Sequence, residues 1–256
     1  MSKGQVAWVV GASSGIGAAV ARRLAAEGFS VAISARRAER LAAMAAEIPG
    51  LHPFPLDAGD REAAAETCRR IISELGGLDL AVFSAAEWHQ NTIADYDAAR
   101  YAAVTRVDYL GAVNMIDPAV THMKQVGGGQ IAIVSSIAGY YGFPSGGPYG
   151  PSKAALIQLA QMMRTELAPL RIDVRLVSPG FVDTELTQRN AYPMPFTLPA
   201  EEAGRRIVDG LLRSKRFEIA FPWPMVLAAK IGRMLPYPLF FLAMKRMLKT
   251  VTRKKG

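Results

Sequence analysis

The chain has 256 residues, of which half are hydrophobic and a fifth are charged. This composition excludes an intrinsically disordered chain, and the length suits one domain with a substantial hydrophobic core. The single cysteine, Cys68, excludes an internal disulfide framework and a cysteine-based metal site. We therefore predict no metal site, and we interpret Cys68 as a buried, inert thiol on a helix.

The net charge of +8 is concentrated at one end of the chain. Residues 205–256 contain 13 lysines and arginines but only 2 acidic residues, whereas residues 1–204 are nearly neutral. A basic end of this kind can meet nucleic acid, an anionic membrane surface or only solvent. No signal peptide precedes the first predicted strand, so we expect a cytoplasmic protein whose basic end is available to the inner face of a membrane.

Short apolar runs alternate with helical patterns along the chain. The predicted strands are Val6–Val10, Ser30–Ser34, His52–Pro55, Leu80–Phe83, Gln130–Ser135, Asp173–Val177 and Phe217–Phe221. The predicted helices are Ala18–Glu27, Ala38–Ile48, Arg61–Leu75, Tyr149–Leu167 and Pro199–Arg213, with two more in Ala94–Val126 joined near Leu110–Gly111. This alternation predicts an α/β fold with a doubly wound parallel sheet and helices on both faces. We place this domain at residues 1–221 and treat residues 222–256 as a C-terminal extension.

The first predicted strand runs into a glycine-rich turn that opens the first helix. Gly11 allows a tight turn, Gly15 lets the backbone approach a phosphate, and Gly17 lets the helix pack close to the strand. The free N–H groups of the first helical turn would then face an anion. The predicted phosphate-binding residues are Gly11, Ser13, Ser14, Gly15, Ile16 and Gly17. An ordinary loop between a strand and a helix is the alternative.

The end of the second strand indicates which dinucleotide binds. An NAD site requires a carboxylate there for the ribose 2′-hydroxyl, but Ala35 stands at that point and Arg36 and Arg37 follow. A guanidinium pairs with a phosphate through two charge-assisted hydrogen bonds, so the cofactor is predicted to be NADP(H), with Arg36 as its first contact. The alternative is that both arginines form a solvated helix start.

Three further strand ends complete the predicted cofactor site. Asp57 could accept a hydrogen bond from the adenine amino group, whereas Asp60 is better explained as a helix N-cap. Small residues after the fourth strand let the backbone pass close to a flat ligand, and a Pro-Gly turn after the sixth can present backbone groups to the nicotinamide. The residues at these two ends are Ser84, Ala85, Ala86, Pro179, Gly180, Val182 and Thr184.

The predicted reaction centre consists of Ser136, Tyr149 and Lys153. Tyr149 and Lys153 are four residues apart at the start of a helix and therefore share one face. A nearby ammonium and a positively charged nicotinamide ring would lower the pKa of the tyrosine, which is about 10 when free. The tyrosine could then exchange a proton with an alcohol or carbonyl oxygen, and Ser136 would stabilise the charge on that oxygen.

With these motifs in order, the chain resembles the short-chain dehydrogenase/reductase family over roughly residues 5–215. The glycine turn, the Pro-Gly-x-x-x-Thr segment and the serine, tyrosine and lysine all match family motifs. The resemblance implies a Rossmann-like sheet of about seven strands in the order 3-2-1-4-5-6-7. It also implies that Lys153 holds the cofactor ribose and that the arginine after the second strand marks an NADP-dependent member.

Three departures from the family pattern stand out. Val10 replaces a threonine, and Phe83-Ser84-Ala85-Ala86 stands where the family shows Asn-Asn-Ala-Gly, which alters a hydrogen bond between central strands. Asp108 stands where the family has its fourth catalytic residue, an asparagine that orders a water in a proton relay. An ionised aspartate cannot donate a hydrogen bond, and it could pair with Lys153 and weaken the hold of that lysine on Tyr149. We place Asp108 in the site; the alternative is that it only bridges a break between helices.

Aromatic and apolar residues near the predicted centre suggest the class of substrate. Tyr140, Tyr141, Phe143, Met194 and Phe196 predict an apolar pocket for a bulky or lipid-like carbonyl compound, and subunit packing is the alternative for some of them. The segment Tyr192–Pro199 is long for a connection in this fold and suggests a lid. We expect no nucleic-acid partner, since the fold offers no recognition module, and we expect a homodimer or homotetramer.

The C-terminal extension contains two amphipathic patterns, Met225–Leu235 and Leu239–Val251. Each places apolar residues on one face and lysines or arginines on another, which suits an interfacial position on a membrane. Packing against the main domain or a partner subunit is the alternative. The sequence as a whole predicts an NADP(H)-dependent carbonyl reductase or alcohol dehydrogenase; the alternative is a non-catalytic NADP(H)-binding protein that uses this extension to bind a membrane or partner.

Overall fold

The computed structural model describes residues 4–88, 93–189 and 194–252, with side chains described as far as residue 248. A parallel sheet of seven strands runs through its centre in the order β3-β2-β1-β4-β5-β6-β9. The strands are β1 (Val6–Val10), β2 (Ser30–Ser34), β3 (Leu51–Pro53), β4 (Leu80–Phe83), β5 (Gly129–Val134), β6 (Ile172–Pro179) and β9 (Glu218–Phe221). The predicted strand order is therefore confirmed: strands are added toward one edge from β1 to β3 and toward the other edge from β4 onward.

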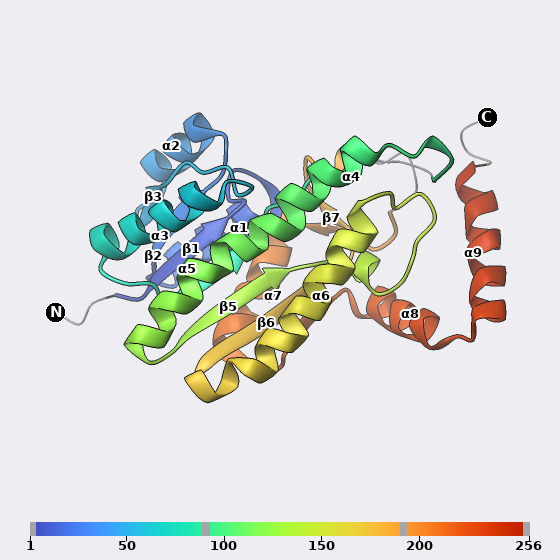
Figure 1. The fold of residues 1–256 in the computed structure, drawn as a ribbon. Coiled ribbons are helices and arrows are strands. Elements are labelled where there is room, and N and C mark those ends of the chain that lie inside the picture. The colour runs from blue at the N-terminus through green and yellow to red at the C-terminus, as the bar shows by residue number, and fades with distance from the viewer. Residues whose placement is uncertain (1–3, 89–92, 190–193, 253–256) are drawn as a thin grey trace.

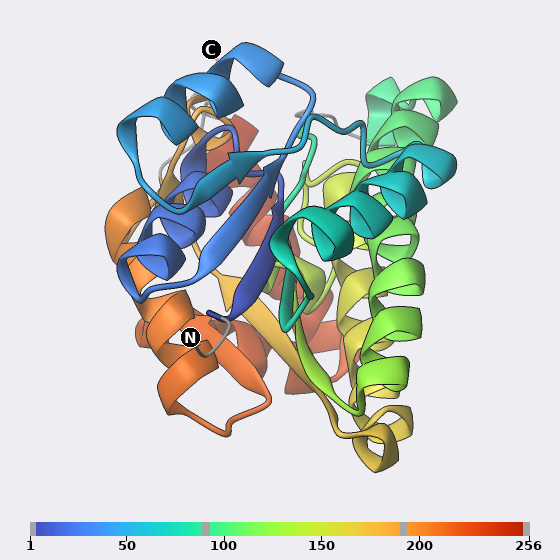
Figure 2. The same ribbon diagram turned by 90° about the vertical axis from the view of Figure 1, so that its left-hand side faces the viewer.

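Helices cover both faces of the sheet, as Figure 2 shows from the side. One face carries α1 (Gly15–Ala26), α2 (Ala38–Glu47) and α7 (Ala200–Arg213); the other carries α3 (Arg61–Leu75), α5 (Gly111–Val126) and α6 (Tyr149–Glu166). The strands are nearly continuous apolar runs because both of their faces are covered. Asp60 caps α3 by accepting a hydrogen bond from the Ala63 amide, as predicted.

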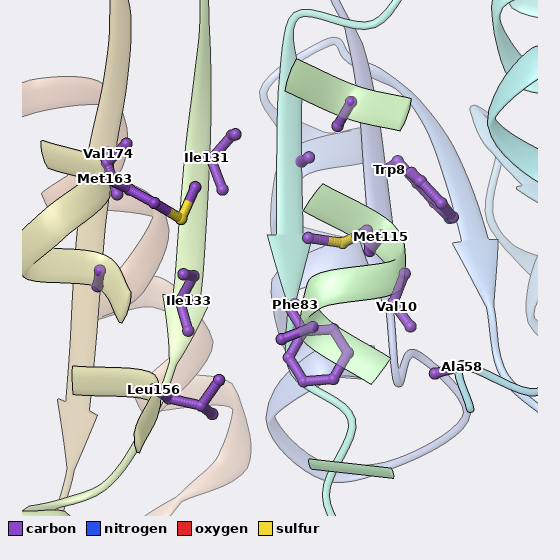
Figure 3. Close-up of a cluster of buried hydrophobic side chains, with 14 of the residues drawn as sticks. Trp8, Val10, Ala58, Phe83, Met115, Ile131, Ile133, Leu156, Met163 and Val174 are labelled. Carbon is purple, nitrogen blue, oxygen red and sulfur yellow. The ribbon is translucent and has the colours of Figure 1, made fainter. Parts of the chain in front are cut away.

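The hydrophobic core lies in two layers, one on each side of the sheet. The layer under α3, α5 and α6 contains large side chains such as Trp8, Phe83, Met115 and Ile133 together with small ones such as Ala58 (Figure 3). The indole N–H of Trp8 donates to the Ser34 hydroxyl at 2.9 Å, so this buried donor is satisfied. Cys68 belongs to this layer, so its predicted burial is confirmed, and burial raises the pKa of its thiol to about 12.

The predicted pair of helices in Ala94–Val126 takes a different form. A short 3₁₀ turn, Ile93–Asp95, precedes α4 (Ala98–Thr105), and a π-helical turn at Arg106–Leu110 leads directly into α5. The chain therefore stays helical through the expected break. A π turn inserts an extra residue into the helix and re-aims the side chains beside it, and this turn contains Asp108, whose side chain is fully buried.

The C-terminal residues form α8 (Trp223–Met234) and α9 (Tyr237–Thr252), which lie beyond one end of the main body (Figure 1). Lys230 of α8 pairs with Glu218 of β9 at 2.7 Å, and the Phe240 ring of α9 contacts the Tyr141 ring with centroids 5.4 Å apart. Within the part of the chain that the structure describes, no helix combines the length and apolar character needed to cross a bilayer. Residues 192 and 193 of the predicted lid lie outside the described residues, and Leu198–Pro199 forms β8, which pairs with β7 (Val182–Asp183).

Candidate active site

The carboxyl ends of the central strands surround a cleft of about 430 Å³. In an open parallel sheet this is where ligands bind, at the point where the strand order reverses. The lining contains the complete predicted cofactor set: Gly11, Ser13, Ser14, Gly15, Ile16, Gly17, Arg36, Arg37, Asp57, Ser84, Ala85, Ala86, Tyr149, Lys153, Pro179, Gly180, Val182 and Thr184. Residues from six separate strand ends therefore meet in one cleft.

The glycine turn has no space for side chains. A Cβ atom at Gly17 would overlap the carbonyl oxygen of Gly11, and one at Gly11 would lie 2.5 Å from the Ala85 amide nitrogen. Gly11 also adopts a φ of +90°, a conformation that favours glycine. The first turn of α1 is thus held tightly against β1 and opens toward the cleft. This cradle at a helix N-terminus fits the phosphates of a dinucleotide.

The two arginines after β2 make different contacts. Arg37 donates to the hydroxyls of Ser13 at 2.8 Å and Ser14 at 2.8 Å, and it pairs with Glu185 at 2.8 Å. Glu185 also pairs with Arg40, and the hydrogen bonds from both arginines lower the pKa of its carboxyl to about 2. Arg36 is exposed at the cleft, and among the described residues its guanidinium makes no hydrogen bond or ion pair. Arg36 is therefore the cation available to a ligand.

Asp57 lines the cleft but is already engaged by the protein. Its carboxylate accepts hydrogen bonds from the Gly59 amide at 3.0 Å and from Arg106 at 2.7 Å. Burial alone would raise the pKa of Asp57, but these hydrogen bonds and the nearby positive charges lower it overall. The carboxylate is therefore ionised and retains lone pairs that can accept a further hydrogen bond.

Ser136, Tyr149 and Lys153 come together where β5 and α6 meet. Ser136 follows β5, and Tyr149 begins α6, so that Lys153 lies one turn further along the same face. The Lys153 ammonium lies 5.2 Å from the centroid of the Tyr149 ring and 3.4 Å from the Val134 carbonyl oxygen. Gly139 packs against the Lys153 backbone, since a Cβ there would lie 2.7 Å from the Lys153 carbonyl carbon. Packing around the lysine therefore fixes this part of α6 against the serine.

The pKa of Tyr149 is raised rather than lowered by the protein. Burial has the largest effect; the Lys153 charge and a hydrogen bond with Ser136 act in the opposite direction, and the Asp108 charge raises the pKa further. The predicted lowering requires a bound nicotinamide as well as Lys153; among the protein groups, desolvation of the phenolate outweighs the attraction of one ammonium. The tyrosine is held in its protonated form.

Asp108 lies behind Lys153 rather than in the cleft. Its carboxylate lies 3.3 Å from the Lys153 ammonium, and it accepts hydrogen bonds from the Ser152 hydroxyl at 3.2 Å and the Glu87 amide at 2.7 Å. Both members of the ion pair are almost completely buried. The prediction that Asp108 pairs with Lys153 matches this geometry, but Asp108 does not line the cleft and would act only through the lysine.

A second cavity, also of about 430 Å³, adjoins the cleft and is almost entirely apolar. Ser136 and Tyr149 line both spaces. Of the five residues predicted for an apolar pocket, only Phe143 is among the described lining residues. Tyr140 instead donates its hydroxyl to Glu218, Tyr141 stacks on Phe143, and Phe196 is exposed. Pro195 lines the cavity in place of its predicted neighbours Met194 and Phe196.

The lining residues that are not predicted from the sequence include Trp88, Met225 and Met247. Trp88 lines both spaces and packs its ring edge-on against Tyr149, with centroids 5.2 Å apart. Its buried indole N–H has no hydrogen-bond partner among the described residues. Trp88 could have been predicted, because it is an aromatic residue just after the end of the fourth strand. Nothing local in the sequence marks the two methionines as lining residues.

Comparison with known proteins agrees with this geometry. The family model for the short chain dehydrogenases matches residues 5–193. This chain belongs to that family. An uncharacterized oxidoreductase of Myxococcus xanthus is 31% identical over 247 residues, covering 95% of this chain and 97% of the relative. Dehydrogenase/reductase SDR family member 4 of Sus scrofa is 33% identical over 189 residues, covering 72% and 68%.

Among solved structures, a short chain dehydrogenase from Burkholderia cenocepacia in complex with NADP superimposes with a TM-score of 0.82. It is 27% identical, and the match covers 94% of this chain and 98% of that one. The match to the family model ends at residue 193, so β8, α7, β9, α8 and α9 lie beyond it, whereas the relative from Myxococcus xanthus aligns with 95% of the chain. The chain is therefore an oxidoreductase of this family.

Proposed function

We propose that this short chain dehydrogenase is an NADP(H)-dependent oxidoreductase that reduces the carbonyl group of an apolar substrate, or oxidises the corresponding alcohol. One observation carries the proposal: Ser136 and Tyr149 lie at the junction of the cofactor cleft and the apolar cavity. A carbonyl at that junction would face the cleft on one side and have its apolar substituents in the cavity on the other. Such a boundary suits hydride transfer to an apolar compound.

The chemistry divides between the cofactor and three side chains. Bound NADPH would supply the hydride to the carbonyl carbon. Tyr149 would donate its hydroxyl proton to the carbonyl oxygen, and its raised pKa keeps that proton in place before reaction. Ser136 would donate a hydrogen bond to the same oxygen. Lys153 would hold the cofactor ribose and stabilise the phenolate that remains, while Asp108 positions Lys153 from behind.

The direct test is to follow NADPH absorbance while uncharged aldehydes and ketones are offered to the full chain. Turnover that depends on Tyr149 supports the proposal. Tight NADPH binding without turnover of any carbonyl or alcohol would support the alternative, a nucleotide-binding protein without catalysis. The buried Asp108–Lys153 pair is the feature that would favour this alternative. The Asp108 carboxylate partly neutralises the Lys153 ammonium, whose charge would stabilise the Tyr149 phenolate.

The choice of NADP(H) rests on Arg36 and on the relative from Burkholderia cenocepacia, which is described in complex with NADP. We expect Arg36→Ala to weaken NADPH binding by about 10-fold or more and to leave NADH binding nearly unchanged, because a hydrogen bond to a charged group contributes roughly 1.5–3 kcal/mol. Titration calorimetry with both cofactors measures the difference. Arg69→Ala is the matched control, since Arg69 pairs with Glu66 on α3 and neither residue lines the cleft. Equal affinity of the unmodified protein for NADPH and NADH would contradict the assignment.

We further propose that the protein is a homodimer or homotetramer and that α8 and α9 contact the inner face of a membrane. Residues 222–256 contain eight lysines and arginines and no acidic residue. Exposed apolar side chains accompany these charges on both helices: Trp223, Leu227, Ile231, Met234, Tyr237, Leu239, Phe241, Leu242 and Leu248. Basic and apolar residues combined on one surface favour an anionic lipid interface.

The lipid contact predicts a charge-dependent association with vesicles. We expect Arg233→Glu combined with Lys245→Glu to reduce binding to anionic vesicles by about 10-fold or more, since each cation near the surface contributes roughly 1 kcal/mol. Sedimentation with anionic and neutral vesicles at low and high salt provides the measurement. Lys124→Glu makes a charge reversal on α5, at the far end of the molecule, and should have little effect. Binding that ignores lipid charge would rule out this contact.

A further inference from the structure

The two C-terminal helices supply part of the wall of the apolar cavity. Met225 of α8 and Met247 of α9 line it together with Ser136 and Tyr149. Both methionines lie beyond residue 193, where the match to the family model ends. The shape of the cavity therefore depends on α8 and α9, which the sequence pattern presents as a C-terminal extension.

Contacts on the inner sides of these helices fix them against the cavity. Ala229 of α8 is buried in the core, and a Cβ at Gly232 would lie 2.9 Å from the Tyr141 ring, so α8 packs closely there. Tyr141 stacks on Phe143, a lining residue, with centroids 4.4 Å apart, and its ring also contacts Phe240 of α9. A continuous row of rings thus joins the cavity to α9.

The position of Met247 follows from helical geometry. It comes seven residues after Phe240, which is close to two full turns of helix, so both side chains lie on the same face of α9. Phe240 anchors this face against Tyr141, and Met247 lies about 10 Å further along the helix, where it lines the cavity. Methionine is unbranched and flexible, so it adapts to chains of different shape.

The chemistry of the lining limits what the cavity accepts. Among its described residues none is charged, and hydroxyl groups come only from Ser136, Ser145, Tyr149 and Thr187. A carboxylate or phosphate inside this space would be desolvated without a charged partner among these residues, which is unfavourable. An aliphatic chain, in contrast, gains free energy for each methylene removed from water.

We propose that Met225 and Met247 are specificity-determining residues that contact the aliphatic chain of an uncharged, long-chain aldehyde or ketone. Its carbonyl lies at Ser136 and Tyr149, a placement that rests on the function proposed above. Met225 packs against Gly180, which lines both spaces, so it contacts the chain beside the cleft, and Met247 of α9 limits the length of chain that fits. A volume of about 430 Å³ is in the range of pockets that enclose small ligands.

The test compares straight-chain aldehydes from butanal to dodecanal in the full chain with NADPH. Met247→Trp fills the part of the cavity beside α9, so kcat/KM for decanal should fall about 10-fold or more through KM, whereas the value for butanal should change less than about 2-fold. Met247→Ala enlarges the cavity and should move the preferred chain to a longer aldehyde. Met234→Ala, a matched change on α8 at a side chain that is 82% exposed, should leave the profile unchanged.

A binding measurement separates this proposal from the proposed reaction. Decanal should displace the uncharged dye Nile red from the unmodified protein but not from Met247→Trp, whether or not any aldehyde is reduced. If no aldehyde is reduced but this difference in displacement is seen, the proposed carbonyl reduction is rejected and the assignment of the methionines to the binding cavity is retained. The proposal that the methionines contact the chain is overturned if a folded Met247→Trp or Met247→Ala variant shows the same chain-length profile, or the same displacement, as the unmodified protein. Retained NADPH affinity establishes that a variant has folded.

Discussion

Tyr149→Phe is expected to retain NADPH binding and to lose carbonyl reduction. The substitution removes only the hydroxyl, so the ring keeps its edge-on contact with Trp88 and its position over Lys153. The carbonyl oxygen then has no proton donor at the right distance, and a positioned acid or base contributes roughly 10²–10⁴-fold to such reactions. We expect kcat to fall by a factor in this range with little change in the Kd for NADPH.

The experiment needs two controls. Tyr141→Phe removes a hydroxyl from another tyrosine close to the cavity, and it should leave kcat unchanged, since the Tyr141 ring serves only in packing. Ser136→Ala should give a smaller loss than Tyr149→Phe because it removes a hydrogen bond and not the transferred proton. Turnover at the unmodified rate in Tyr149→Phe would remove the tyrosine from the mechanism.

Asp108→Leu is expected to destabilise the folded chain by about 3–5 kcal/mol, because it leaves the Lys153 ammonium buried without its carboxylate partner. Chemical denaturation followed by circular dichroism measures the free energy of unfolding. The double variant Asp108→Leu with Lys153→Met removes both charges and should recover most of the loss. If the double variant is less stable than the single one, the pair does not account for the effect.

The pH dependence of Asp108→Asn tests the same carboxyl without leaving a cavity. Burial raises the pKa of Asp108 above its usual 3.8, so the folded chain binds that proton more tightly than the unfolded chain does. The carboxyl therefore favours the folded state fully below about pH 4, and this contribution is lost as pH rises through the raised pKa. Asparagine does not titrate, so the stability of the variant relative to the unmodified protein should increase as pH rises.

We also expect the turnover of Asp108→Asn to equal or exceed that of the unmodified protein, because asparagine can donate a hydrogen bond. A large loss of turnover would assign the carboxylate a role of its own.

Much of this architecture could be read from local patterns. Each strand is a short apolar run, and each helix is marked by its own periodicity or cap, as at Asp60. Right-handed crossovers between parallel strands then bring all of the carboxyl ends to one edge of the sheet. For that reason the glycine turn, Arg36, Ser136 and Tyr149 could be predicted to meet in one cleft before any coordinates were known.

The tertiary structure alone decided how distant side chains meet. Arg37 is bound by Ser13 and Glu185 within the wall of the cleft, and Asp108 reaches Lys153 from a π turn. Met247 lines the same cavity as Tyr149, although the two residues are more than ninety positions apart in the sequence. No local pattern contains these contacts, because each depends on the packing of two or three separate elements and on rotamers chosen by that packing. Sequence periodicity thus determined the sheet and the edge at which chemistry occurs. Close packing between remote segments determined which charge is buried, which arginine remains available and what closes the apolar cavity.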